Sequence, residues 1–486
     1  MARLAAEYGD LLTADCSEYD PFRERRPGFG GHERTRGMQR TIDVAATLDA
    51  QGVGGFQLRV FLLCAALLFV DGFDVQGITY VAPAISQDWK LARGALGPTF
   101  SAGLFGVMLG AILLAPLADR VGRRLVIIWS CTAFGIGTLA TVWAGSLTEL
   151  LVVRFLTGLG LGSALPNAIG LASEYAPKPR RATVVTFVGS GISLGAIGSG
   201  IAAAQLIAPY TWRAVFVVGG VLPLGLAAVL WLGLPESLRF AALVPRRQAE
   251  ARRLLAKLTR GAPPGDDVLV VSGDTESGQI TVADLFREAR GVTTALLWTA
   301  FFTSLLNVYL VINWLPTSLT SSGFTVTDAA VMTTFYHVGG LAGTYLLGLA
   351  MDRLGAHRMQ IFAMLVSAAG LSVFATVGGM TRWETTAVLM LAGFGVVGGQ
   401  VGVNALASMT YPVAMRSTGL GWALGVGRVG SIVGPTIGGI MLASAHDPRS
   451  VYLVCIAPSI VGVAAVALLK RRASAATRPA TAPTSH

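Results

Sequence analysis

Two aspartates three residues apart are the side chains in this sequence best placed to do chemistry. Asp71 and Asp74 stand inside a long apolar run, on roughly the same face of a helix. An ionisable side chain at membrane depth is costly and by default indicates a function. Two carboxylates that lie close together in a medium of low dielectric repel each other, so one of them should bind a proton near physiological pH. A cap, a kink or a fixed partner for an arginine is the structural alternative.

Two arginines inside other apolar runs complement these aspartates. Arg154 lies a few residues inside its run, at about the depth of Asp74, so an Asp74–Arg154 pair is possible and protonation of Asp74 would release Arg154. Arg428 lies about 16 Å into its run, near the middle of a bilayer. A guanidinium there needs an anion, and its planar fork matches a carboxylate. We therefore expect Arg428 to bind the carboxylate of a substrate, or to position a group that does.

An enzyme could also use an Asp-x-x-Asp motif, since prenyl-transfer enzymes hold Mg²⁺ on a pyrophosphate this way. Such a site needs a second acidic cluster on a facing helix, and the sequence has none. It also lacks the GxxxxGK[ST] phosphate loop, and its four cysteines are far apart, without a CxxC pair. We predict no metal, no cofactor and no catalytic residues.

Neutral side chains in the apolar runs are weaker candidates for substrate contacts. A histidine near the middle of its run could bond a phenol or relay a proton, and the others could stack on a ring or donate hydrogen bonds. Packing in the core or against lipid is the alternative for each of them. These candidates are His337, Tyr309, Asn313, Trp314, Gln400 and Asn404.

Composition places these residues in a membrane protein. Of the 486 residues 53% are hydrophobic and 13% charged, where a soluble domain has about 25% charged residues. The 60 glycines suit close helix contacts in lipid. The net charge of +10 lies in short clusters between apolar runs, which argues against nucleic-acid binding. We expect a multi-pass protein of the lipid bilayer.

Twelve stretches are long enough to cross a bilayer, which needs roughly 20 apolar residues per helix. We predict an all-α protein with two six-helix bundles, 58–235 and 291–470, joined by a central loop at 236–290. The tails, 1–57 and 471–486, are polar, and we expect the first to be disordered, with Met38 as a second possible start. The stretches begin near Leu58, Leu96, Leu125, Leu147, Thr183, Trp212, Val292, Asp328, Met359, Thr385, Ser417 and Ser450.

The loops between these stretches differ in charge and thereby predict an orientation. One side collects twelve Lys and Arg residues and the other five, before the N-terminal tail and the central loop are counted. Positive loops stay in the cytoplasm. Both termini should therefore be cytoplasmic, and the central loop as well.

The two halves repeat a charged loop at an offset of 233 residues. The first copy follows helix 2 and the second follows helix 8. The rule that positive loops stay in the cytoplasm explains the arginines there but not Asp119, Glu174 or Gly122, so we predict a gate. Asp119 would meet the end of helix 11, and Arg123 and Arg124 would reach Glu174. These contacts would hold the outward-open state and break on inward opening. The gate residues are Asp119, Arg120, Gly122, Arg123, Arg124, Glu174, Asp352 and Arg353.

With these motifs, residues 40–470 resemble the major facilitator superfamily, and within it the aromatic acid:proton symporters of bacteria. The resemblance rests on Asp71-Gly-Phe-Asp74, on the loop motif, on Arg154-x-x-x-Gly158 and on Gly427-Arg428-x-Gly430. Ala115, where the family usually has glycine, and a degenerate second loop copy depart from the pattern.

The resemblance implies a proton-driven symporter that imports a small aromatic carboxylate by alternating access, acting as a monomer in a bacterial inner membrane. Asp71, Asp74 and Arg154 would couple the proton. A sugar, an aliphatic acid or a drug is the alternative substrate, and Pro235-Glu236-Ser237 is shared with sugar-type members.

Overall fold

A computed structural model gives the fold, and it describes residues 41–49, 52–259, 268–270, 281–287, 290–412, 415–444 and 448–476. Residues 1–40, with Met38 and most of the predicted disordered tail, lie outside this range. So does the end of the C-terminal tail.

The N-terminal bundle is formed by the helices that the first six apolar stretches predict. The second and fourth are interrupted, so each consists of a long helix followed by a shorter one. In chain order the elements are α3 (Gly55–Asp88), α4 (Gly97–Leu113), η2 (Ala115–Leu117), α5 (Ala118–Val121), α6 (Arg123–Ala140), η3 (Thr141–Trp143), α7 (Leu147–Gly162), α8 (Ala164–Tyr175), η4 (Lys178–Arg180), α9 (Arg181–Leu206) and α10 (Trp212–Gly233).

The C-terminal bundle also has six long helices, but its second and fourth are continuous, and its last helix is preceded by a 3₁₀ segment. All twelve predicted starts lie within three residues of the starts of these helices or spans. The elements are α13 (Gly291–Ser321), α14 (Val326–Leu354), α15 (Ala356–Thr376), α16 (Arg382–Thr410), α17 (Arg416–Ser444), η8 (Pro448–Cys455) and α18 (Ile456–Ala476).

The fold is all-α and crosses a membrane many times. Ten spans in the described part are long and apolar enough to cross a bilayer by length and composition. The long helices α3 and α14 are not among them, although they have 34 and 29 residues. The count of twelve therefore stays a prediction.

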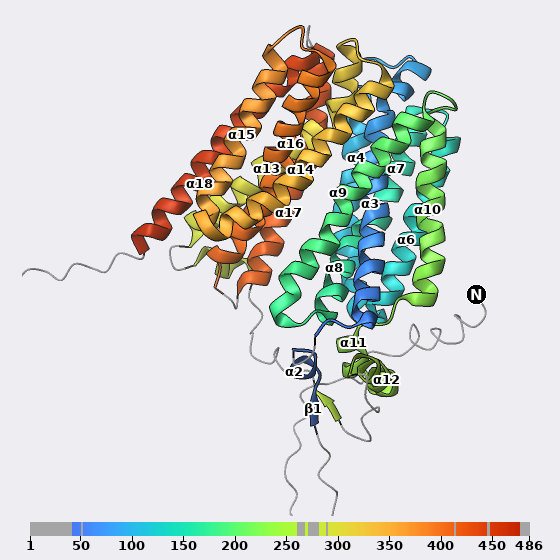
Figure 1. Cartoon of the computed structure of the whole chain (residues 1–486), viewed down its shortest axis with the longest axis vertical. Helices are drawn as coiled ribbons and strands as arrows, with labels where there is room; N and C mark the ends of the chain where they lie inside the picture. Colours follow the sequence, from blue (N-terminus) through green and yellow to red (C-terminus); the bar gives the residue numbers. More distant parts are fainter. Residues whose placement is uncertain are drawn as a thin grey trace, which may run out of the picture.

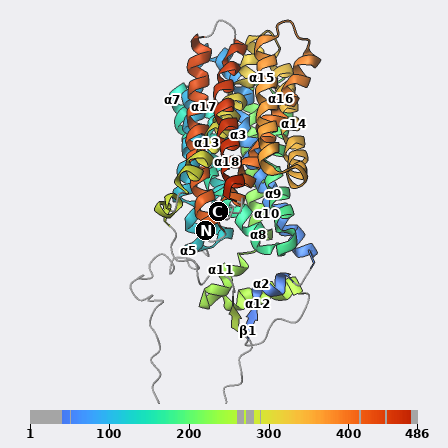
Figure 2. The same ribbon diagram turned by 90° about the vertical axis from the view of Figure 1, so that its left-hand side faces the viewer.

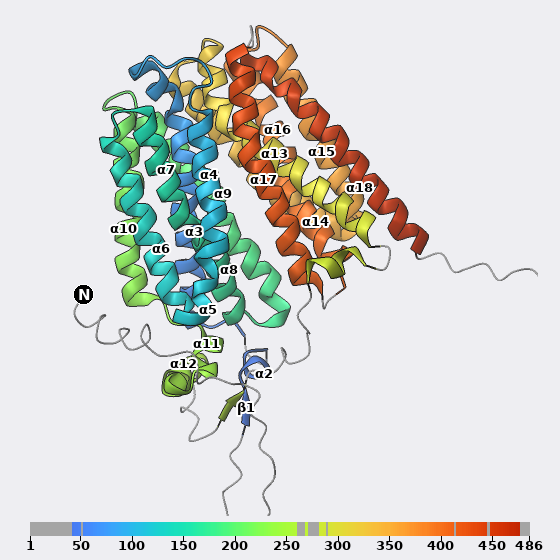
Figure 3. The same cartoon turned by 180° about the vertical axis from the view of Figure 1, so that it is seen from behind.

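The two bundles touch at one end and separate toward the other (Figures 1 and 3). We call the end that carries α2, α11 and α12 the loop end, and the opposite end the far end. At the far end, Phe100 packs edge-on against Trp314 with ring centroids 5.2 Å apart, and Ser101 donates a hydrogen bond of 2.7 Å to the Ile432 carbonyl. Both contacts join the bundles, and they close the far end.

One far-end contact is made by backbone alone. Gly94, with φ +82°, lies so close to Gly439 that a Cβ on Gly94 would overlap the carbonyl oxygen of Gly439. Gly97, at the start of α4, lies beside Pro435 and Trp314. No larger residue fits at this crossing.

A small unit lies beneath the N-terminal bundle at the loop end (Figure 2). It consists of β1 (Thr41–Asp43), α2 (Val44–Asp49), α11 (Leu238–Leu243), η5 (Pro245–Arg247), α12 (Gln248–Thr259) and β2 (Val268–Val270). A further 3₁₀ turn, η6 (Val282–Phe286), precedes α13.

The prediction that the whole of 1–57 is disordered is therefore wrong for its last part. Strand β1 pairs in parallel with β2 of the central loop, with Thr41 opposite Val268. The Asp49 carboxylate accepts the Lys178 backbone N–H at 2.8 Å, and that bond lowers the pKa of Asp49. Partners distant in sequence order this segment, and a local reading of its polarity cannot detect them.

Candidate functional site

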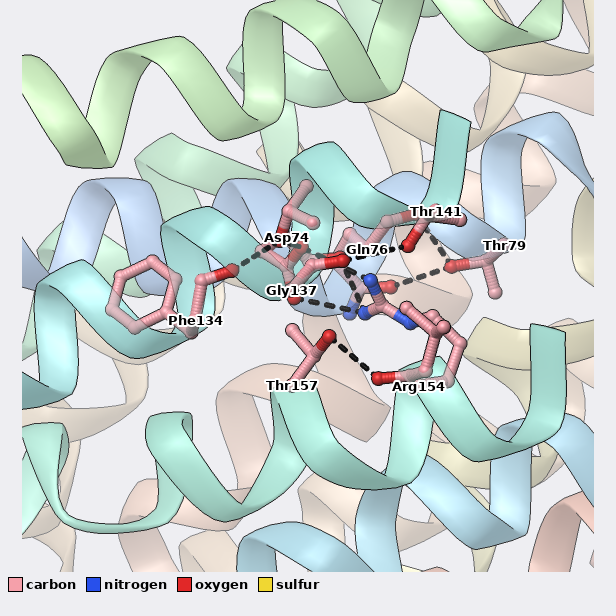
Figure 4. Close-up of polar contacts among 10 residues, drawn as sticks. Asp74, Gln76, Thr79, Phe134, Gly137, Thr141, Arg154 and Thr157 are labelled. Atoms are coloured by element: carbon pink, nitrogen blue, oxygen red, sulfur yellow. Dashed lines mark hydrogen bonds and ion pairs between the residues drawn. The ribbon is translucent and has the colours of Figure 1, made fainter. Parts of the chain in front are cut away.

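The predicted pair of Asp74 and Arg154 is formed inside the N-terminal bundle (Figure 4). Nη2 of Arg154 lies 2.8 Å from Oδ2 of Asp74, and Nη1 lies 3.1 Å from Oδ1. The guanidinium thus grips the carboxylate with two parallel bonds, which is the strong form of this interaction. Both side chains are buried, with exposed fractions of 5% and 0%. Removing either partner of such a buried pair would leave an uncompensated charge and would destabilise the protein.

Neighbouring helices hold the pair in place. The Thr138 hydroxyl of α6 lies within hydrogen-bond distance of Oδ1 of Asp74 and 2.8 Å from the Phe134 carbonyl, so these two acceptors share its one proton. The Arg154 guanidinium lies over the Phe216 ring of α10, 5.9 Å from its centroid. Helices α3, α6, α7 and α10 therefore all contribute to this one charged centre.

Asp71, one turn away, has quite different surroundings. It is buried, with 7% of its surface exposed, but makes no hydrogen bond within the described part of the chain. Its charge interacts with that of Asp74 and with that of Arg428, which belongs to the other bundle. Asp71 is thus the carboxylate that can change its protonation state without breaking a bond.

Arg428 of α17 is half-buried and faces the centre of the molecule. Its Nη1 lies 3.5 Å from the Tyr309 hydroxyl of α13, which is a long contact. Among the described residues no carboxylate lies within 4 Å of its guanidinium. A cation at this depth that lacks a paired anion is able to bind one.

A pocket lies between the Asp74–Arg154 pair and Tyr309. It has about 430 Å³ of empty space, part of it open to solvent, and is bounded by α3, α4 and α7 of one bundle and α13 of the other. Most of the walls are apolar, and polar groups are few. The polar side chains are Gln76, Thr99, Arg154, Tyr309 and Asn313, and the apolar walls include Val75, Ile78, Phe100, Leu104, Val107, Leu161 and Ile312.

The sequence does not predict most of these pocket residues, and Gln76, Thr99 and Phe100 are examples. Gln76 follows Asp74 by two residues, and its oxygen accepts the Thr79 hydroxyl at 3.0 Å. The Thr99 hydroxyl is buried and without a partner among the described residues. Phe100 lines the pocket and packs against Trp314, which lies outside it. Only the proximity of Gln76 to Asp74 signalled any of this in the sequence.

Three other predicted substrate contacts differ in their surroundings. Asn313 lines the pocket, and its amide nitrogen donates to the Tyr309 carbonyl at 2.7 Å. Gln400 accepts a hydrogen bond of 2.8 Å from Ser304. Asn404 is half-buried with an unpartnered oxygen.

Two predicted contacts lie away from the pocket. Trp314 is fully buried, and its indole nitrogen donates to the Pro435 carbonyl at 2.8 Å, so it closes the far end. His337 is buried beside Tyr80 and Tyr336, with ring centroids 6.4 and 5.5 Å away, and its Nε2 has no partner among the described residues. Neither residue lines the pocket.

The loop motif is joined to the central loop in a way that we had not predicted. Glu236 accepts the backbone N–H groups of Arg124 and Ser237 at 3.1 and 2.8 Å. It is 3% exposed, and this burial raises its pKa. Gly122, with φ +102°, lies against the Glu236 carboxylate, where a Cβ would overlap Oε2. The strained turn of the motif thus fits around one carboxylate.

The predicted pairing of Arg123 with Glu174 is present, with Nη1 and Oε1 2.7 Å apart. The prediction that it breaks on opening is wrong, because both residues belong to the N-terminal bundle and remain paired although the bundles are separated at this end. Arg124 does not reach Glu174 but donates to the Trp231 carbonyl at 2.5 Å. Ser237 donates to Glu174 at 2.5 Å.

The remaining gate residues are on the surface. Asp119 and Arg120 of the first copy, and Asp352 and Arg353 of the second, are exposed. Gly355 takes the same turn as Gly122, with φ +89°, but a Cβ there would meet nothing within 4 Å. In the first copy the turn fits around the Glu236 carboxylate, which we call the carboxylate cradle, and the turn of the second copy has no such carboxylate within 4 Å.

Comparison with known proteins agrees with this architecture. The model of the Major Facilitator Superfamily matches residues 64–317 and 297–485, and the chain belongs to this family of membrane transporters. It is a multi-pass transporter and not an enzyme, as the sequence predicts.

The chain is also similar to individual transporters and to a solved structure of this fold. The chain is 36% identical over 433 residues to the 4-hydroxybenzoate transporter PcaK of Pseudomonas aeruginosa, covering 88% of this chain and 95% of that one. It is 36% identical over 406 residues to the gallate transporter of Pseudomonas putida, covering 83% and 89%. Among solved structures, a bacterial homologue of the human lysosomal transporter Spinster in an inward-facing conformation matches with a TM-score of 0.68 at 18% identity, covering 89% of this chain and all of that one.

Proposed function

We propose that this protein imports a small aromatic carboxylate, of the benzoate or hydroxybenzoate type, together with protons across the inner membrane of a bacterium. The similarity to transporters named for 4-hydroxybenzoate and gallate supports the substrate class. The excess of Lys and Arg in the loops at the loop end supports a cytoplasmic position for that end and for both termini.

The observation that carries the proposal is the state of Arg428. This guanidinium lies near the middle of the membrane without a paired carboxylate among the described residues, beside an apolar pocket. An arginine binds a carboxylate through two parallel hydrogen bonds. A benzoate-type anion would pair with Arg428 and place its ring in the pocket, against Ile312 and Leu104.

The pocket suits a ring that has one polar substituent. Its apolar walls bury the ring, while Gln76, Thr99 and Asn313 supply hydrogen-bonding groups away from Arg428. A sugar would need polar partners around its whole circumference, which the apolar walls do not supply. This difference favours an aromatic acid over the sugars of other superfamily members.

Asp71 couples the proton to the substrate in this proposal. When Asp71 is charged, it competes with the substrate for Arg428, since both are anions that interact with one guanidinium. Protonation of Asp71 frees Arg428 and thereby favours substrate binding. The Asp74–Arg154 pair holds the neighbouring carboxylate in two hydrogen bonds, so that Asp71 is the carboxylate left to take up the proton.

Transport itself requires the two bundles to rock about this site. The closed far end and the separated loop end correspond to a state open toward the cytoplasm, from which substrate and proton leave. Opening the far end would break the contacts of Phe100 with Trp314 and of Ser101 with α17. One proton carried with a monoanion moves no net charge, so that stoichiometry uses the pH gradient alone.

Uptake into proteoliposomes tests the proposal. Radiolabelled benzoate and 4-hydroxybenzoate should accumulate when the outside is made acidic, and accumulation should stop when an ionophore collapses the pH gradient. Asp71→Asn should abolish the response to the gradient while retaining exchange of substrate down its own gradient. Ser372→Ala, a change on α15 outside the pocket, is the matched control and should transport normally.

Two results would contradict the proposal in different ways. Gradient-driven uptake by Asp71→Asn equal to that of the unchanged protein would remove the role of Asp71. Uptake of a sugar, an aliphatic acid or a drug with no uptake of any aromatic acid would leave the fold and refute the substrate class. A monomer should suffice for transport, which reconstitution at less than one chain per vesicle tests.

A further inference from the structure

A second polar pocket lies wholly inside the C-terminal bundle. It has about 310 Å³ of empty space, part of it open to solvent, between α13, α15, α16 and α18. No charged side chain lines it, yet many of its lining side chains have oxygen atoms. These are Thr303, Ser304, Asn307, Gln360, Ser367 and Ser459.

Asn307 presents an oxygen to this pocket. Its amide nitrogen donates hydrogen bonds to the Cys455 carbonyl at 3.2 Å and to Ser459 Oγ at 2.9 Å. The carbonyl partner fixes the orientation of the amide, because only the nitrogen can donate to it. The amide oxygen then has no partner among the described residues, although the residue is only 6% exposed.

Three of the hydroxyl groups around the pocket have already used their protons. Thr303 donates to the Thr299 carbonyl at 2.9 Å, Ser304 donates to Gln400 at 2.8 Å, and Ser459 donates to the Cys455 carbonyl at 2.8 Å. Their lone pairs are what remains for a ligand. The pocket therefore offers acceptors and few donors.

Two further residues extend this acceptor set. Ser367 is buried and makes no hydrogen bond within the described part of the chain. Gln360 is 1% exposed, and its amide oxygen has no partner there either. A half-turn of the Gln360 amide exchanges its oxygen and nitrogen, so it can direct the oxygen at a bound ligand.

The backbone beside the pocket is irregular as well. The 3₁₀ segment η8 ends at Cys455, where α18 begins, and Pro458 in the first turn of α18 lines the pocket. Non-helical backbone at membrane depth occurs where it borders a cavity, and in transporters its carbonyl groups coordinate cations.

The sequence repeat explains why no cationic side chain of the protein lines this pocket. Asn307 follows Asp74 by the repeat offset of 233 residues, so the pocket is the counterpart of the charged centre in the other bundle. There the acceptor is a carboxylate and Arg154 supplies the cation. At the corresponding place in the C-terminal bundle, Leu389 is apolar, and no cation side chain lines the pocket.

We propose that this pocket binds a monovalent alkali-metal cation, with Na⁺ as the ligand. Oxygen atoms of amides, hydroxyls and backbone carbonyls are the ligands that hard cations prefer. One such ion can contact several of the oxygen atoms that line the pocket. Among the described residues, no hydrogen-bond donor pairs with the amide oxygens of Asn307 and Gln360. The ion would complete the C-terminal bundle as Arg154 completes the N-terminal one.

Direct binding of ²²Na⁺ to the purified full-length protein in detergent tests this site. Saturable binding of about one ion per chain is expected, together with a higher thermal unfolding midpoint in NaCl than in choline chloride. Ser367→Ala removes one ligand without removing a hydrogen bond within the described part of the chain, and it should weaken Na⁺ binding about tenfold. Asn307→Asp adds a charge and should tighten it.

Matched variants separate this site from others and from misfolding. Ser372→Ala, the same change one and a half turns further along α15, should bind Na⁺ normally, and so should Asp71→Asn in the other bundle. Absence of saturable ²²Na⁺ binding, which is the result expected if only water fills the pocket, would overturn the proposal. Loss of binding in Asp71→Asn, or unchanged affinity in both Ser367→Ala and Asn307→Asp, would overturn it as well. None of these outcomes depends on which organic substrate is transported.

Discussion

Replacing Gly122 by alanine should destabilise the protein far more than the same change at Gly355. The two glycines occupy equivalent turns of the repeated loop, with φ, ψ of +102°, 147° and +89°, 135°. L-residues are strained in this region, so each substitution should cost about 1–3 kcal/mol on that ground alone. Only at Gly122 would the new methyl group also overlap a carboxylate, that of Glu236.

The additional cost at Gly122 follows from the bonds of Glu236. If the methyl group displaces this carboxylate, the backbone N–H groups of Arg124 and Ser237 lose a charged acceptor. A hydrogen bond to a charged group contributes about 1.5–3 kcal/mol. The difference between the two variants should then be at least about 2 kcal/mol, or for a chain of 486 residues a thermal midpoint lower by about 2 °C or more.

Thermal unfolding of the two purified variants in one detergent measures this difference. Gly355→Ala is the control, because it has the same backbone strain and an open environment. The double variant Gly122→Ala with Glu236→Gln indicates whether the clash or the lost charge dominates. Equal midpoints for Gly122→Ala and Gly355→Ala would refute the reasoning, since the carboxylate cradle would then contribute nothing.

Three further expectations follow from the structure. Arg428→Lys should raise the KM for benzoate-type substrates about tenfold, because an ammonium cannot form two parallel bonds to a carboxylate; initial uptake rates measure this, and an unchanged KM would contradict it. Burial raises the pKa of Glu236, so the folded protein retains a proton there that the unfolded chain releases. The unchanged protein should therefore gain stability relative to Glu236→Gln as the pH falls from the raised value toward the usual 4.5; parallel pH profiles of the unfolding midpoints would argue against this. Ser101→Ala removes the hydroxyl that bonds to Ile432 and lies 2.8 Å from that of Thr436. It should shift the population toward an open far end about fivefold, and distances between spin labels on the two bundles measure this shift, with identical distributions counting against it.

Much of the fold could be predicted because the membrane constrains it so strongly. The helix starts could be predicted from the length of the apolar stretches alone. A helix that crosses lipid must form all its backbone hydrogen bonds within itself, and no loop can lie in the hydrocarbon region. Equal depth along two helices made the Asp74–Arg154 pair possible, and the resemblance to the superfamily implied that these two helices line one cavity. The helix starts depend on one property of a single segment, whereas the pair also needed the fold that the resemblance implies.

The features that could not be predicted depend on several helices at once. The pocket beside Arg154 uses residues of four helices, and Thr99 has no feature in the sequence that distinguishes it from other threonines. The prediction that the Arg123–Glu174 pair breaks on opening failed although the predicted bundle 58–235 contains both residues, because a contact within one bundle need not change when the bundles separate. In the sequence, Glu236 stands out only as part of a motif that sugar-type members share. Its contact with the turn at Gly122 is visible only in the structure.

The crossing of Gly94 over Gly439 has a mechanical consequence. Where two bodies meet through bare main chain, the surfaces slide past each other without any side chain having to change rotamer. This contact therefore offers little resistance to the movement of the two bundles during each transport cycle. A single added methyl group there would act as a wedge, and we would look to this point first for variants that trap the protein in its other orientation.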